Sequence, residues 1–134
     1  MKLYNSDKFR FIAGLIFIVI IYSWNYLYFI EYKNQLLLPK ITMHFLSFTI
    51  TIVVYFIGTF HLGQLKDTWM SSLWHLVHIS GLIIMISLGL VNLFIIELNV
   101  NLKHLVYSIQ ETLISPVLYV AMGLLNKTLN KQNK

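Results

Sequence analysis

An acidic residue stands inside an apolar segment in the C-terminal part of the chain. Glu111 lies about seven residues, or roughly 10 Å along a helix, beyond His104. An ionised carboxylate at such a depth in a bilayer costs at least about 2.5 kcal/mol, so it should be protonated, paired or in contact with water. We predict a hydrogen bond from Glu111 to His104 or His44. The expected intramembrane polar or ion site comprises Glu111, His44, His104, Ser108 and Asn92.

This predicted site has two interpretations. Ionisable groups inside a membrane commonly mark proton or ion pathways, which favours a transport role. A buried carboxylic acid can equally fix helix packing, here by a hydrogen bond to Ser108, Thr112 or a neighbouring helix. The sequence leaves both interpretations open.

Three histidines surround the central break in the apolar pattern and form a predicted inner-side cluster: His61, His75 and His78. Three imidazoles could hold zinc or another divalent metal, and two on facing helices could be axial ligands of haem b. His75 and His78 are three residues apart, so they share a helix face but point differently. Because Asp67 is the one carboxylate close in sequence, we favour packing or interfacial histidines, with no metal and no cofactor. Haem b stays an alternative.

Several kinds of chemistry are excluded or lack their motifs. The absence of cysteine excludes disulfides, cysteine-ligated metal centres and thiol redox chemistry. The chain also has no glycine-rich phosphate loop, no Ser/His/Asp grouping on a recognisable turn and no paired carboxylates. We therefore predict no catalytic residues and no autonomous enzyme.

The composition requires a solvent other than water. The chain has 134 residues, of which 57% are hydrophobic and 11% charged, far from the usual soluble range. A membrane helix needs about 20 mostly apolar residues, and four segments qualify, at about 9–29, 41–62, 72–96 and 104–125, before a polar tail at 126–134. Short links make neighbouring spans antiparallel. The predicted fold is all-α, a polytopic membrane protein with one membrane domain, 1–134, and an antiparallel four-transmembrane-helix bundle.

The basic residues predict the orientation. One side holds seven of them, Lys2, Lys8, Arg10, Lys66, Lys127, Lys131 and Lys134, and the other holds three, Lys33, Lys40 and Lys103. This asymmetry places both termini in the cytoplasm, with the chain in an inner membrane. Trp69 and Trp74 are then expected at the inner interface. Lys66, Lys127 and Lys131 are predicted to face a cytoplasmic partner, although simple positive-inside bias explains them too. Nucleic acid is not an expected partner.

Small and polar side chains should line the contacts between spans. They follow one face of three segments: His44, Ser47, Thr51, Tyr55, Gly58 and His61; then Trp74, His78, Gly81, Met85, Gly89 and Asn92; then His104, Ser108, Glu111, Ser115, Tyr119 and Met122. The predicted helix-packing residues are Gly58, Gly81, Gly89 and Ser115. The first span lacks such a stripe and is expected to be the most exposed to lipid. Pro116 should bend the last span.

In size, number of spans, basic inner loops and Ile/Asn/Lys-rich composition, the chain resembles the compact four-span proteins of bacterial defence and immunity modules. These include immunity proteins against pore-forming toxins and membrane partners of phage-defence effectors. No motif carries the resemblance, so it assigns no residue a role. We expect a small inner-membrane subunit that oligomerises and binds a cytoplasmic partner. The alternatives are an ion or proton channel that uses Glu111 with His44 or His104, and a haem-binding electron-transfer subunit.

Overall fold

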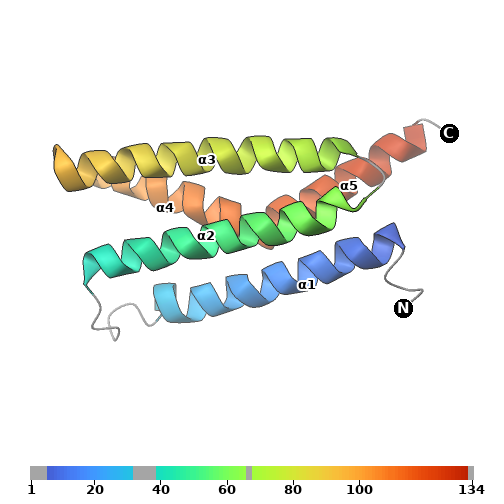
Figure 1. Cartoon of the computed structure of the whole chain (residues 1–134), viewed down its shortest axis with the longest axis horizontal. Helices are drawn as coiled ribbons and strands as arrows, with labels where there is room; N and C mark the ends of the chain where they lie inside the picture. The colour runs from blue at the N-terminus through green and yellow to red at the C-terminus, as the bar shows by residue number, and fades with distance from the viewer. Residues whose placement is uncertain (1–5, 32–38, 66–67, 133–134) are drawn as a thin grey trace.

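The computed structural model describes residues 6–31, 39–65 and 68–132, and within them every regular element is a helix. The elements are α1 (Asp7–Asn25), the short π-helix η2 (Tyr26–Glu31), α2 (Lys40–Gly63), α3 (Thr68–Phe94), α4 (Val100–Ile114) and α5 (Pro116–Gln132). The helices lie lengthwise beside one another, with the start of α1, the end of α2, the start of α3 and the end of α5 at one end (Figure 1). The all-α prediction is confirmed.

Three helical segments are long and apolar enough to cross a membrane, namely Asp7–Tyr28, Ile41–Gly63 and Thr68–Phe94. A fourth span results if α4 and α5, which are bent by 53° relative to each other, are taken together. Large apolar side chains stand exposed on these helices, among them Ile16, Phe45 and Ile83. A surface of this kind is compatible with a lipid environment and costly in water.

Polar side chains define where two of the helices begin. The Ser6 hydroxyl accepts a hydrogen bond of 3.2 Å from the backbone N–H of Phe9 at the start of α1. The Asn99 side chain accepts one of 2.9 Å from the N–H of Leu102 at the start of α4. Serine and asparagine stabilise helix N-termini in this way because the first N–H groups lack a partner within the helix.

The bend between α4 and α5 is a helix end followed by a new helix start. Ser115 has extended backbone angles, φ −61° and ψ 135°, because the ring of a following proline disfavours the helical conformation. The Ser115 hydroxyl then accepts a hydrogen bond of 3.2 Å from the N–H of Val117. Ser115 therefore caps α5, and Pro116 occupies the first helical position, where it needs no N–H donor. The chain bends at the expected proline.

Among the three long helices, α1 is less buried than α2 and shares the smallest buried fraction with α3, so the high exposure predicted for the first span is found in both. The most apolar 18-residue window of α1 is 17% buried, the same share as in α3. Gly14 lets α1 approach its neighbours closely, since a Cβ atom there would lie 2.4 Å from the Tyr119 hydroxyl and 2.8 Å from His61 Cβ. Phe11 stacks on Tyr119 with ring centroids 4.5 Å apart. Gly14 and the Phe11–Tyr119 stack thus contribute to the contacts of α1 with α2 and α5, although α1 has no polar stripe.

Candidate functional site

Aromatic and imidazole rings from three helices meet in the interior and form what we call the central aromatic cluster: Tyr55 of α2, Trp74, His75 and His78 of α3, and Tyr119 of α5. Trp74, His78 and Tyr119 are fully buried. The Trp74 ring centroid lies 4.0 Å from that of His78 and 5.7 Å from that of Tyr119. The burial of Trp74 agrees with its place in the predicted stripe of contacts between spans.

Hydrogen bonds from the cluster connect the helices. The Trp74 indole N–H donates to the Tyr55 backbone carbonyl at 3.1 Å, which links α3 to α2. The Tyr119 hydroxyl donates to the Phe11 carbonyl at 3.0 Å, which links α5 to α1. The Tyr55 hydroxyl and His75 Nδ1 are hydrogen bonded at 2.6 Å. Such bonds satisfy polar groups that neither lipid nor an apolar core could satisfy.

His78 connects α3 to the break in the last span. Its Nδ1 lies 3.1 Å from the Trp74 carbonyl oxygen and its Nε2 lies 3.0 Å from the Leu113 carbonyl oxygen. In an uninterrupted helix the Leu113 carbonyl would accept from the N–H of Val117, but that N–H bonds to Ser115 instead. Because both neighbours of His78 are acceptors, a neutral imidazole donates to one of them at a time. In the tautomer that carries its proton on Nε2, His78 supplies the donor that α4 loses at the break.

The structure places two of the predicted packing glycines in close contacts within one chain. A Cβ atom on Gly58 would lie 2.2 Å from Trp74 Cε2, and one on Gly81 would lie 2.7 Å from Leu113 Cδ1. Gly89 differs, because a Cβ atom there would have nothing within 4 Å. The space beside Gly58 and Gly81 is therefore filled by side chains of the same chain. These two glycines are not available for contact with another chain.

The inner-side histidines do not converge. His61 is buried with its Nδ1 bonded to the Ile57 carbonyl at 2.8 Å, while His75 and His78 have the partners given above. Among residues 6–31, 39–65 and 68–132, no three His, Asp or Glu side chains form a group that could hold a metal ion. A haem iron at His78 would have to displace a hydrogen bond to a backbone carbonyl. The geometry gives each histidine a role in helix contacts.

The predicted ion site is not assembled. His44, His104, Ser108 and Glu111 are all exposed in the single chain. Asn92 instead closes the turn after α3, where its side-chain oxygen accepts a hydrogen bond of 2.9 Å from the N–H of Leu98. Over the described part of the chain, the Glu111 side chain has no hydrogen bond or ion pair. The expectation that Glu111 turns into the bundle is therefore wrong for the single chain.

The break between α4 and α5 explains why Glu111 does not face the interior as predicted. The sequence pattern placed His104, Glu111 and Tyr119 on one face by assuming a continuous helix. The extended backbone of Ser115 interrupts the helical phase, so residues before and after it do not share a face. Tyr119 and Met122 of α5 are buried, but α4 buries Leu113 and Ile114 instead.

The outward side of α4 carries what we call the α4 polar stripe: Asn101, His104, Ser108, Glu111 and Thr112, all exposed. These positions fall within about 100° of the helix circumference. The predicted site does not include Asn101, and Thr112 was not predicted to lie on this face. The signal was available, because the apolar residues Leu102, Val106, Ile109 and Leu113 recur at steps of four and three, which predicts a buried face opposite the stripe.

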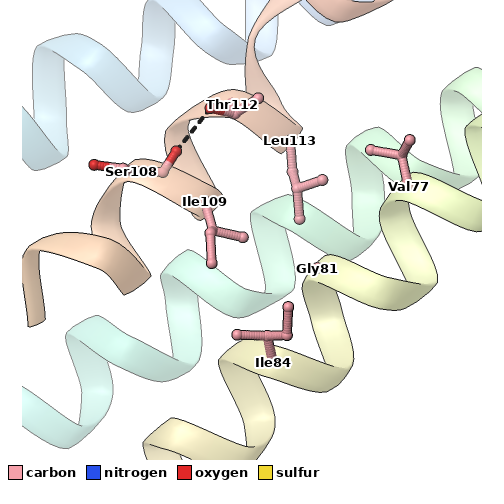
Figure 2. Close-up of a pocket in the computed structure, with 7 residues that line it drawn as sticks. All are labelled: Val77, Gly81, Ile84, Ser108, Ile109, Thr112 and Leu113. Atoms are coloured by element: carbon pink, nitrogen blue, oxygen red, sulfur yellow. Dashed lines mark hydrogen bonds between the residues drawn. The ribbon is translucent and has the colours of Figure 1, made fainter. Parts of the chain in front are cut away.

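A shallow groove of about 280 Å³ runs beside the stripe between α3 and α4. Figure 2 shows its lining, Val77, Gly81 and Ile84 from α3 and Ser108, Ile109, Thr112 and Leu113 from α4. The Thr112 hydroxyl donates to the Ser108 carbonyl at 2.8 Å, as the dashed line in Figure 2 marks. Since this hydroxyl is engaged with its own helix and the other side chains are mainly apolar, the groove suits an apolar group.

The predicted partner-facing lysines lie near one end of the chain. Lys127 and Lys131 are exposed on α5. Lys66 lies outside the described residues. On the same end, Arg10 of α1 donates to the Gln64 carbonyl at 2.7 Å, and the Trp69 indole N–H donates to the Asn126 side chain at 3.0 Å. The first bond holds α1 to the end of α2 and the second holds α3 to α5, both close to the exposed lysines.

Comparison of the chain with protein-family models, with curated proteins and with solved structures finds no match in any of the three. What the protein does is therefore inferred from its own residues and geometry.

Proposed function

We propose that this protein is a four-span inner-membrane subunit that acts by assembling with other chains and catalyses no reaction of its own. In this proposal α4 and α5 together form the fourth span of an antiparallel bundle, and both termini lie in the cytoplasm. The observation that carries it is the α4 polar stripe, which stands exposed on a chain whose other outward surfaces are largely apolar.

The polar side chains of the stripe need hydrogen-bond partners, which lipid hydrocarbon does not provide. Contact between an ionised Glu111 and hydrocarbon costs at least about 2.5 kcal/mol. Between membrane helices, by contrast, polar side chains form hydrogen bonds that favour association. The single chain leaves the Glu111 carboxyl exposed. A second polypeptide against α4 removes this cost, so the stripe is a contact surface within the membrane.

The end that carries the start of α1 and the end of α5 supplies a second surface (Figure 1). Its cations include Lys8 and Arg10 of α1 and Lys127 and Lys131 of α5, and the asymmetry of basic residues favours the cytoplasm for this end. Exposed lysines there suit an acidic surface on a soluble partner. A membrane component of a bacterial defence or immunity system would have this organisation.

Extraction of the full chain in mild detergent is expected to recover it together with at least one further polypeptide. Reversal of Lys127 and Lys131 to Glu should lower recovery of a cytoplasmic partner about fivefold, since two exposed charge pairs contribute about 1 kcal/mol. Affinity purification followed by mass spectrometry measures both results. Lys103→Glu, at the other end of the chain where Lys103 pairs with Glu97 at 2.8 Å, is the control and should leave recovery unchanged. A chain recovered alone and monomeric would contradict the proposal.

A channel is the second candidate, because several α4 polar stripes around an axis could line a water path. The stripe ends at the break, however, since the outward residues of α5 there are Val117, Ala121 and Leu124. His61 and His78, the expected inner end of such a path, are buried within the chain. Assembly without conduction is therefore favoured.

Proteoliposomes distinguish the two candidates. Proton and monovalent-ion flux through the purified protein is expected to stay at the level of empty vesicles, and Glu111→Gln should not alter it. Flux above that level that falls on this substitution would instead establish the channel.

A further inference from the structure

We propose that the chain covering the α4 polar stripe is a second copy of this protein, inserted with the same sidedness and related by a two-fold axis along the membrane normal. Glu111 then forms hydrogen bonds across the axis to the stripe of the other copy. The inference rests on the proposed function, which makes the stripe a contact surface, and adds the identity of its occupant.

The chemistry of the stripe is self-complementary. A protonated carboxyl group has one O–H donor and acceptor oxygens, and a hydroxyl group likewise donates and accepts. Glu111 can therefore bond to Glu111 or Ser108 of an identical stripe without any other residue type. A two-fold interface presents the same patch from both partners, so a patch that satisfies itself is what such an interface requires.

Membrane insertion sets the register of this contact. Copies with the same sidedness hold their α4 helices parallel, so each residue meets its counterpart at the same depth. Glu111 and Ser108 are three positions apart, or about 4.5 Å along the helix, and a glutamate side chain reaches across that distance. A different protein would have to bring its own donor or cation to the depth of Glu111, whereas a second copy carries the matching groups already.

Contacts within the chain leave the Glu111 carboxyl and the Ser108 hydroxyl available for a second copy. The Glu111 side chain has no hydrogen bond or ion pair within the described ranges, and Ser108 contributes its backbone carbonyl, not its hydroxyl, to the bond with Thr112. The packing glycines Gly58 and Gly81 are filled from within the chain. This leaves the polar stripe, beside the open position at Gly89, as the surface proposed for association.

Crosslinking tests which chain lies against the stripe. The chain contains no cysteine, so Ser108→Cys introduces a single thiol at the centre of the stripe. Mild oxidation in native membranes is expected to give a disulfide-linked species of twice the mass of the chain. Ile16→Cys, on an exposed apolar position of α1, is the matched control and should remain monomeric.

Two substitutions test the part played by Glu111. Glu111→Gln keeps donor and acceptor groups and should leave the dimer dissociation constant nearly unchanged. Glu111→Leu removes them and should raise that constant about five- to thirtyfold, as expected for interhelical hydrogen bonds of about 1–2 kcal/mol. Energy transfer between labelled copies in vesicles of decreasing protein-to-lipid ratio measures it. Both variants should keep the unfolding midpoint of the parent, because the side chain is exposed and has no polar partner inside the described part of the chain.

The outcomes separate the two proposals. Homodimers linked through the thiol of the Ser108→Cys variant that weaken on Glu111→Leu support both. A crosslink from that thiol to a different protein keeps the assembly role and overturns the second copy. Equal dimerisation of the Leu and Gln variants overturns the role of Glu111. Monomers throughout, with no crosslink from the introduced thiol, overturn both proposals.

Discussion

Gly58→Ala should destabilise the folded chain by about 2 kcal/mol, although it adds a single methyl group. The new Cβ would lie 2.2 Å from Trp74 Cε2, well inside van der Waals contact. The Trp74 ring is fully buried and its N–H is held by the Tyr55 carbonyl, so it has no room to move. Overpacking of this kind costs about 1–3 kcal/mol, and the rigid ring places this cost at the upper end. The preference of alanine for the helix, up to about 1 kcal/mol, offsets part of it.

Gly89→Ala is the matched control for this substitution. It makes the same change in the middle of a helix, but nothing lies within 4 Å of the added Cβ. Alanine also favours the helix over glycine by up to about 1 kcal/mol, so stability should hold or rise. The free energy of unfolding in mixed micelles, followed by far-UV circular dichroism, measures both variants. Equal losses at the two positions would show that α2 and α3 do not pack as described.

His78→Phe should cost about 2–3 kcal/mol even though it keeps a ring in the stack with Trp74 and Tyr55. The substitution removes the donor to the Leu113 carbonyl, and leaving a buried acceptor unsatisfied costs about 1–3 kcal/mol. The loss should also loosen α4 against α3. Spin labels at Ile86 of α3 and Leu105 of α4, both exposed, would report a broader distance distribution.

His75→Phe serves as the comparison. His75 is half-buried and bonds to the Tyr55 hydroxyl, which can turn to another acceptor, so we expect a loss of about 0.6 kcal/mol, the average for such bonds in membranes. The distance distribution between the same two labels should not change. If substitution at His75 loosened α4 as much as substitution at His78, the bond to Leu113 would have no special part in the bend.

Much of the fold follows from simple properties of the sequence. Runs of about 20 apolar residues require helices in lipid, because no other structure satisfies every backbone group there. The predicted ranges 9–29, 41–62 and 72–96 accordingly overlap α1 with η2, α2 and α3. The third helix begins four residues earlier, at Thr68, since a helix continues past the apolar run until its backbone is interrupted. Pro116 marked the bend for the same local reason.

The candidate site was harder to predict because the orientation of a helix about its own axis depends on the whole chain and not on the local sequence. The stripes of α2 and α3 were continuous, and Thr51, Gly58, His78 and Gly81 are buried as their spacing indicated. The stripe in the last span crossed Ser115, where the chain leaves the helical conformation, so its two halves turned to different sides. Serine followed by proline is a helix-start signal, and it separates Glu111 from Tyr119.

Four contacts between helices share one property. Arg10, Trp74 and Tyr119 donate to the backbone carbonyls of Gln64, Tyr55 and Phe11, and the Nε2–H tautomer of His78 donates to that of Leu113. A backbone acceptor survives any side-chain replacement that keeps the helix in place. Tolerance to mutation is therefore asymmetric across each of these contacts: the donor position is constrained by its chemistry, whereas the acceptor position can drift in sequence without breaking the bond.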